Sequence, residues 1–208
     1  VPLLHVLARR RVPAAPEDGR RDLYFWLGWG TLLVAFVSPL CALSAALFSA
    51  RVAHHVLLVA VAAPFLALAN PYRAKMNLPH PGLWLFVHAA ALWFWHAPMP
   101  YEWALRSDAL YWLMQGTLLL TAILFWASVL GDPRRAMAAP LVLLAAMMQM
   151  GLLGALITFA PRPLYQAHFL STEPFGITAL ADQQLAGLIM WVPGALPYLI
   201  ASLLLAAA

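Results

Sequence analysis

Charged residues are scarce in this chain. Only 10% of its 208 residues are Asp, Glu, Lys or Arg, whereas a soluble globular chain carries about 25%. So few charges cannot cover a water-exposed surface, which excludes an ordinary soluble protein. The chain also has a single cysteine, Cys41, which excludes an internal disulfide framework and any metal motif built on two cysteines.

Apolar residues make up 64% of the chain and fall into long runs that are almost free of charge. Runs of about 18 or more such residues are typical of membrane spans, and six are present. They cover residues 23–40, 51–70, 82–98, 109–130, 137–160 and 182–207. A span in hydrocarbon must satisfy its own backbone hydrogen bonds, and no run alternates as barrel strands do. We therefore predict an all-α, polytopic transmembrane helix bundle with six spans.

A short basic segment, residues 1–22, precedes the predicted bundle of residues 23–208. Residues 1–8 are apolar like the last turns of another span, and they lead directly into three arginines at positions 9–11. We expect a seventh span before the six, incomplete in this sequence. The pattern of a secretory signal peptide is not found.

Basic residues are distributed unequally over the loops. One alternate set of loops holds nine, which are Arg9, Arg10, Arg11, Arg20, Arg21, Arg73, Lys75, Arg134 and Arg135, and the other holds Arg51, Arg106 and Arg162. Cytoplasmic loops carry the excess of Lys and Arg, so both ends of this fragment are predicted to be cytoplasmic, in a bacterial inner membrane. The loops at 40–50, 98–108 and 161–181 then face the periplasm. Because the basic residues are dispersed over membrane loops, the lipid bilayer and not nucleic acid is the expected partner.

Four of the seven histidines, His54, His55, His96 and His168, are predicted at the periplasmic ends of the spans. If the second span is helical from its start, Arg51 shares a stripe with His54 and His55. Imidazoles combined with sulfur ligands suit copper, and Met99 and Cys41 lie near the same layer. The four histidines could instead serve only as hydrogen-bonding groups at the headgroup boundary.

Three polar residues, Asp182, Gln183 and Gln184, begin the last predicted span in this same layer. Metal-binding imidazoles usually need hydrogen-bond partners that fix their tautomers, and we expect these residues to provide them. Capping of its own helix would explain Asp182 equally well. His88 lies in the middle of the third span, where it is either a buried hydrogen-bonding group or a ligand.

Three segments resemble the polytopic CtaG family of cytochrome c oxidase assembly factors. They are Ser38-Pro39 followed by Phe48-Ser49-Ala50, His54-His55-Val56-Leu57-Leu58 and Ala62-Ala63-Pro64; Trp95-His96-Ala97-Pro98 followed by Tyr101; and Asp182-Gln183-Gln184-Leu185-Ala186-Gly187-Leu188-Ile189-Met190-Trp191. The resemblance implies a seven-helix protein that helps copper reach a heme-copper oxidase during assembly. The implied partners are the oxidase subunits and a periplasmic copper donor.

The resemblance assigns family positions to five residues: His55, His96 and the triplet Asp182, Gln183 and Gln184. It also shows departures. Arg51 stands where the family usually has its first histidine, and His54 stands where it usually has glutamine. In the fourth span, residues 112–116 read Trp-Leu-Met-Gln-Gly in place of a His-x-x-Glu-His pattern.

The expected function is therefore that of a non-enzymatic assembly factor, since no catalytic motif is found. Its copper site is predicted to consist chiefly of His54, His55, His96 and His168, with Met99, Cys41 and Asp182 in reserve. Two alternatives remain open. One is a heme-binding electron-transfer protein that uses His55 and His88 as axial ligands, and the other is an assembly scaffold without a metal, which the departures from the family pattern favour.

Overall fold

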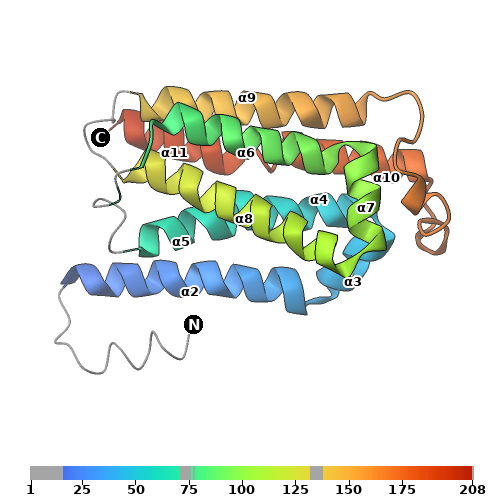
Figure 1. Ribbon diagram of the computed structural model, residues 1–208, viewed down its shortest axis with the longest axis horizontal. Coiled ribbons are helices and arrows are strands. Elements are labelled where there is room, and N and C mark those ends of the chain that lie inside the picture. Colours follow the sequence, from blue (N-terminus) through green and yellow to red (C-terminus); the bar gives the residue numbers. More distant parts are fainter. Residues whose placement is uncertain (1–15, 71–75, 77, 132–137, 208) are drawn as a thin grey trace.

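The computed structural model describes residues 16–70, 76, 78–131 and 138–207 of the chain. All regular structure in these residues is helical, so the predicted all-α class is confirmed for them. The long helices lie side by side along one axis, and the short helix α7 (Pro98–Arg106) crosses one end of the bundle (Figure 1). We call this end the α7 end.

The elements follow one another along the chain with short breaks. They are α2 (Pro16–Val37), α3 (Pro39–Ala46), α4 (Phe48–Val56), η1 (Leu57–Ala62), α5 (Ala63–Ala69), α6 (Pro81–His96), α7, α8 (Asp108–Leu130), α9 (Ala139–Thr158), η4 (Gln166–His168), η5 (Glu173–Phe175), α10 (Ala179–Trp191) and α11 (Leu196–Ala206).

Four helical stretches of the described residues are long and apolar enough to cross a membrane. They are Phe48–Ala69, Asp108–Leu130, Ala139–Thr158 and Ala179–Ala206. The pair Gly19–Val37 and Pro39–Ala46, bent by 50°, makes a fifth if it is counted as one span. The third predicted span corresponds to α6, whose 16 residues extend only about 24 Å.

The first helix begins earlier than the sequence pattern predicts. α2 starts at Pro16, within the segment that we predicted to precede the bundle, and its first turns carry Arg20 and Arg21. The predicted seventh span and the arginines at 9–11 lie outside the described residues, as do Arg73, Lys75, Arg134 and Arg135.

Prolines set several helix boundaries. Pro39 occupies the first turn of α3, and Ser38 caps it through a hydrogen bond to the backbone N–H of Leu40. Pro is favoured at the first helical position, where its missing N–H has no intrahelical partner. Pro193 lies in the break between α10 and α11, since proline has no backbone N–H with which to continue a regular helix.

A π-helical segment, η1, follows the two histidines of α4 directly. Pro64, in the first turn of α5, has no N–H with which to continue a regular α-helical ladder. The Trp126 indole N–H of α8 donates to the carbonyl of Val59 within η1, at 2.9 Å. π-helical turns are frequent at functional sites, and this one ties the histidine-bearing helix to α8.

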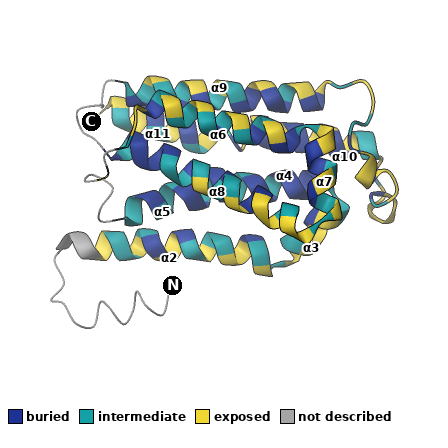
Figure 2. Ribbon diagram, viewed as in Figure 1, coloured by how far each residue is buried: buried dark blue, intermediate teal, exposed yellow. Residues whose placement is uncertain are grey.

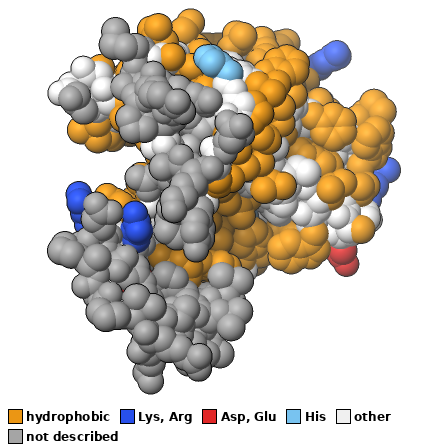
Figure 3. All heavy atoms as spheres, turned by 60° about the vertical axis from the view of Figure 1, so that its left-hand side comes forward, with side chains coloured by type: hydrophobic (Ala, Val, Ile, Leu, Met, Phe, Trp, Pro, Cys, Tyr) orange, Lys and Arg blue, Asp and Glu red, His pale blue; other side chains and the backbone are white. Residues whose placement is uncertain are grey.

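Apolar side chains cover the outside of the bundle and polar ones lie within it. Exposed and buried positions alternate around the helices (Figure 2), and the space-filling view shows mainly apolar side chains with few charges (Figure 3). Phe86 is 71% exposed and Leu141 68%, whereas His54 and Asp182 are completely buried. This is the distribution expected of a bundle surrounded by lipid, in which ionisable groups face the interior.

Close contact between α9 and α10 depends on glycine. A Cβ added to Gly154 would lie 2.8 Å from the carbonyl oxygen of Gly187 and 3.1 Å from the backbone nitrogen of Trp191. Small residues at such crossings let membrane helices approach each other closely. The start of α10, with its polar triplet, is thereby fixed beside the end of α9.

Candidate functional site

Buried polar side chains gather inside the bundle near the α7 end. They belong to helices α4, α6 and α8 and are each at most 3% exposed: Arg51, His54, His55, His96 and Gln115. Arg51 was counted with the periplasmic loops in the charge comparison and was also predicted to begin the second span, and it lies within α4. The α4 residues His54 and His55 follow Arg51 by three and four positions, so all three lie on one side of the helix.

His55 and His96 face each other across α4 and α6. Nδ1 of His55 lies 3.4 Å from Nε2 of His96, and the ring centroids are 5.3 Å apart. Nδ1 of His96 lies 2.8 Å from the carbonyl oxygen of Leu92. A carbonyl only accepts, so Nδ1 carries the proton, and Nε2 offers its lone pair toward His55.

This pair fits a metal ion held by two imidazoles. Two metal–nitrogen bonds of about 2 Å each span at most about 4 Å, and the 3.4 Å separation lies within that reach. The Leu92 carbonyl does what the hydrogen-bond partner of a metal-bound histidine normally does, because it fixes the tautomer and the ring orientation.

His54 stands beside this pair with neither ring nitrogen hydrogen-bonded. Its ring centroid is 6.0 Å from that of His55, and it packs edge-on against Phe36 of α2 at 4.9 Å. Both nitrogens are therefore available to a ligand. In the described residues, no group of three or more His, Cys, Asp or Glu side chains is arranged to hold a metal ion, and this includes the three histidines His54, His55 and His96.

His168 is committed to other partners. Its Nε2 lies 2.7 Å from the Tyr101 hydroxyl, and its Nδ1 lies 2.9 Å from the carbonyl oxygen of Ala46. Burial raises the pKa of Tyr101, so the hydroxyl stays protonated and donates a hydrogen bond to Nε2. Nδ1–H of His168 donates a hydrogen bond to the carbonyl oxygen of Ala46. With both nitrogens used, His168 links α7 to the end of α3.

The charge state of His168 should affect stability in mildly acidic solution. Burial lowers the pKa of His168 from its usual 6.5, outweighing the opposite influence of the Ala46 carbonyl and the Asp182 carboxylate. Below pH 6.5 the unfolded chain then binds more protons than the folded one, so stability is lost as the pH falls from 6.5 toward the folded-state pKa. We expect His168→Gln to lose less thermal stability than the unsubstituted protein between pH 7.5 and 5.5. An unchanged pH dependence would contradict this.

An aromatic cluster covers the histidine pair at the α7 end. Phe48 stacks on Tyr165 with centroids 3.8 Å apart, and Tyr101 packs edge-on against both at 5.2 Å. The Tyr165 hydroxyl donates to the carbonyl oxygen of His96 at 2.7 Å. Burial raises the pKa of Tyr165, which preserves this donor. Tyr165 lies in a loop and belongs to no motif, so no pattern in the sequence pointed to it.

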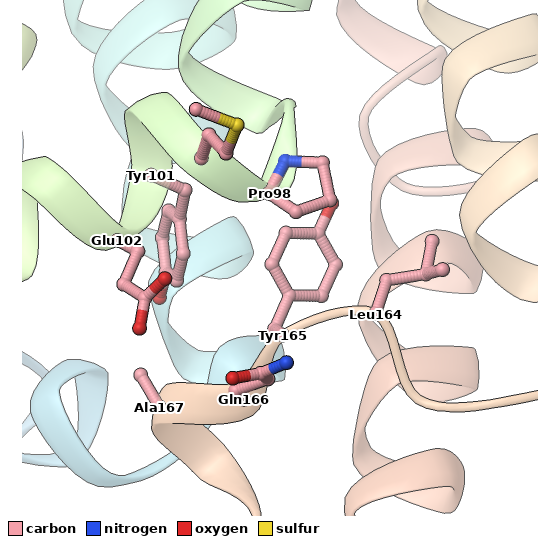
Figure 4. A pocket seen from close by; sticks show the side chains of 8 residues that line it. Pro98, Tyr101, Glu102, Leu164, Tyr165, Gln166 and Ala167 are labelled. Atoms are coloured by element: carbon pink, nitrogen blue, oxygen red, sulfur yellow. The ribbon is translucent and has the colours of Figure 1, made fainter.

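A pocket of about 130 Å³ opens beside this cluster, between α7 and the segment 164–167 (Figure 4). It is lined by Pro98, Met99, Tyr101, Glu102, Leu164, Tyr165, Gln166 and Ala167. Met99 is 64% exposed here, so the thioether lies at the surface and not with the buried histidines. Cys41, in α3, is half-buried and carries a free thiol.

The polar triplet of α10 has partners other than imidazoles. Asp182 accepts hydrogen bonds from the backbone N–H groups of Phe48 and Ser49, at 2.6 and 3.2 Å, and from the Ser49 hydroxyl. Gln183 accepts from the N–H of Leu164 and donates to the carbonyl of Ile157. Gln184 is exposed. Asp182 thus caps the helix that carries His54 and His55, and Gln183 fixes the loop that carries Tyr165.

His88 lies two turns before His96 on α6 and bonds to the hydroxyl of Thr121 at 2.9 Å. Its ring stacks against Phe125 at 6.0 Å. The heme alternative paired His88 with His55, but the structure turns His55 toward His96 and His88 toward α8.

The fold and the site together define a helical membrane protein with a buried histidine cluster at one end. A family model described as cytochrome c oxidase caa3 assembly factor (Caa3_CtaG) matches residues 3–208. The chain belongs to this family, as the sequence resemblance implied. Neither the curated proteins nor the solved structures give a match.

Proposed function

We propose that this assembly factor holds Cu(I) between His55 and His96 on the periplasmic side of a bacterial inner membrane and passes it to a heme-copper oxidase. An assembly role implies association with the oxidase, and the family indicates a non-catalytic function. The observation that supports copper binding is the 3.4 Å approach of the two facing imidazole nitrogens.

The chemistry of the pair suits a cargo that must be released again. Two neutral imidazoles leave most of the coordination sphere of the ion open, so a third ligand can enter before either histidine leaves. Within the protein the further imidazole is that of His54, whose nitrogens are both unpartnered. Its side chain would have to turn to reach the ion, since the three histidines are not placed to share one. A partner protein supplies the third ligand during transfer.

The pocket at the α7 end is the entry that we propose for copper. Its exposed Met99 offers a soft sulfur, the kind of ligand that selects Cu(I). Its wall includes Tyr165, whose hydroxyl reaches the His96 carbonyl. A periplasmic copper donor and the oxidase subunits would both approach this end.

We further propose that six spans cross the membrane, with α6 and the bent pair α2 and α3 included, and that both ends of this chain are cytoplasmic. In a Cys41→Ser background, a cysteine replacing the exposed Leu170 should react with an impermeant maleimide in intact cells. A cysteine replacing the exposed Met76 should react only after permeabilisation. The opposite labelling pattern would reverse the orientation.

Metal analysis after anaerobic loading with Cu(I) tests the copper proposal. We expect about one copper ion per folded chain and an absorption spectrum without a Soret band. A Soret band would instead support heme binding. A folded protein that retains neither copper nor heme would support the metal-free scaffold.

A further inference from the structure

Several buried polar atoms next to the histidine pair have no hydrogen-bond partner. They are Nε and Nη1 of Arg51, both ring nitrogens of His54, Nε2 of His55, and both amide atoms of Gln115. A buried polar atom left unpaired costs about 1–3 kcal/mol. So many unpaired polar atoms in one place indicate a bound ligand that forms hydrogen bonds with them.

These atoms belong to two helices, α4 and α8. The guanidinium carbon of Arg51 lies 5.1 Å from the centre of the Tyr111 ring, so the Arg51 side chain reaches from α4 to α8. Gln115 follows Tyr111 by four residues, and His55 follows Arg51 by four, so each lies one helical turn further into the bundle on the same face. The unpaired atoms therefore extend from Arg51 to the level of the histidine pair.

The charge of Arg51 is not balanced by an ion pair. Arg51 is only 3% exposed, and in the described part of the chain no carboxylate lies within ion-pair distance of it. The Asp182 oxygens are taken by Phe48 and Ser49. A guanidinium cannot shed its proton in a protein, and a buried charge needs a partner. The groups beside it are neutral: the Tyr101 hydroxyl interacts with it, and the Tyr111 ring provides a cation–π contact, worth about 2 kcal/mol when desolvated.

Hydrogen-bond donors outnumber acceptors among the unpaired groups. Arg51 offers N–H groups at two nitrogens, Gln115 offers its NH₂, and neutral His54 offers one N–H. The acceptors are Gln115 Oε1 and one nitrogen on each of His54 and His55. A ligand that suits this set is rich in acceptors and negatively charged. We propose that Arg51 and Gln115 form a binding site for a small anion beside the histidine pair.

The proposed anion and the copper ion should favour each other's binding, an expectation that rests on the proposed function. A metal on Nδ1 of His55 leaves the proton of the neutral ring on Nε2, which turns that unpaired atom into another donor. The metal also adds positive charge. Coupling of this kind is reciprocal and typically changes each affinity by about 5-fold or more.

Formate is the probe for this site, because a small carboxylate matches guanidinium and amide donors and competes poorly for Cu(I). Without copper, thermal unfolding of the purified protein should shift upward by about 5 °C as formate replaces gluconate at constant ionic strength, and the shift should saturate. Arg51→Met and Gln115→Leu should abolish the shift. Arg106→Gln, which changes an arginine whose side chain is 72% exposed, should retain it.

Two sources of the anion can be distinguished with Cu(I) supplied either as a cationic complex with the neutral ligand acetonitrile or as an anionic complex with a small thiolate. A saturable formate effect that requires Arg51 supports a free anion. No formate effect, combined with at least 5-fold tighter uptake of the thiolate complex by the unsubstituted protein than by Arg51→Met, supports an anion that arrives with the metal.

If neither formate nor the thiolate complex distinguishes the unsubstituted protein from Arg51→Met and Gln115→Leu, the anion site is wrong. Formate stabilisation in a protein that never retains copper would keep the anion site and refute the copper proposal. If Arg51→Met does not fold, Gln115→Leu alone decides, since it leaves the charge in place and removes only the amide.

Discussion

Replacing His55 or His96 by alanine is expected to weaken Cu(I) binding about 100-fold or more. Loss of a hydrogen-bond partner behind a metal ligand already costs 10–100-fold in affinity, and these substitutions remove the ligand itself. One imidazole would remain of a pair whose nitrogens are 3.4 Å apart. Competition with a chromophoric Cu(I) chelator measures the affinity.

His80→Asn is the matched control for these variants. The exposed His80 caps α6 by accepting a hydrogen bond from the N–H of Gly82 at 3.1 Å, and asparagine is an equally good cap. This variant removes an imidazole without touching the pair and should bind copper normally. If His55→Ala and His96→Ala fold and still bind Cu(I) as His80→Asn does, the two histidines are not the ligands.

The second large effect is expected at Asp182, where alanine should destabilise the protein by about 3 kcal/mol or more. The substitution leaves the N–H groups of Phe48 and Ser49 and the Ser49 hydroxyl without their acceptor, in a completely buried place. Each buried donor left unpaired costs about 1–3 kcal/mol. The favourable contact of a carboxylate with the positive end of α4 is lost as well. Thermal unfolding in detergent or nanodiscs measures the change.

Two further variants separate this capping role from a general effect of charge. Asp108→Ala removes an exposed carboxylate from the first turn of α8 and should cost about 1 kcal/mol or less. Asp182→Asn keeps one acceptor oxygen, so its loss of stability should lie between those of Asp182→Ala and Asp108→Ala. If Asp182→Ala unfolds at the same temperature as Asp108→Ala, the cap does not stabilise the helix that carries the histidines.

The sequence was sufficient for the class of fold and for the approach of His55 to His96. Charge-free runs predict membrane helices because hydrocarbon forces the backbone to pair with itself. Spans joined by a short connection become antiparallel neighbours, which brings the start of α4 near the end of α6. Both inferences depend on local patterns, which a single sequence displays.

The partners of Asp182 and His168 could not be derived in this way. Asp182 bonds to residues 133 and 134 positions away, and His168 to one 122 positions away. Such contacts depend on how the helices pack and not on spacing within a motif. Tyr101 had a signal, since it follows the Trp-His-Ala-Pro segment, but Tyr165 and Gln115 had none that pointed to a site.

Arg51 shows how a charge can mislead a topology argument. The charge count grouped it with the periplasmic loops, although it is also the first residue of the second predicted span, and its side chain is buried within α4. The bias of basic residues remains without Arg51, because one set of loops then holds nine basic residues and the other holds two, Arg106 and Arg162. The helical position of Arg51 agrees with the other prediction made for it, that it shares one stripe of the helix with His54 and His55.

X-ray absorption at the copper edge, on protein loaded anaerobically with Cu(I), tests the central claim most directly. We predict nitrogen scatterers at about 2 Å with the outer-shell signature of two imidazoles, and loss of one imidazole in His96→Ala. A spectrum dominated by sulfur at about 2.3 Å, or unchanged by His96→Ala, would contradict a copper site between His55 and His96.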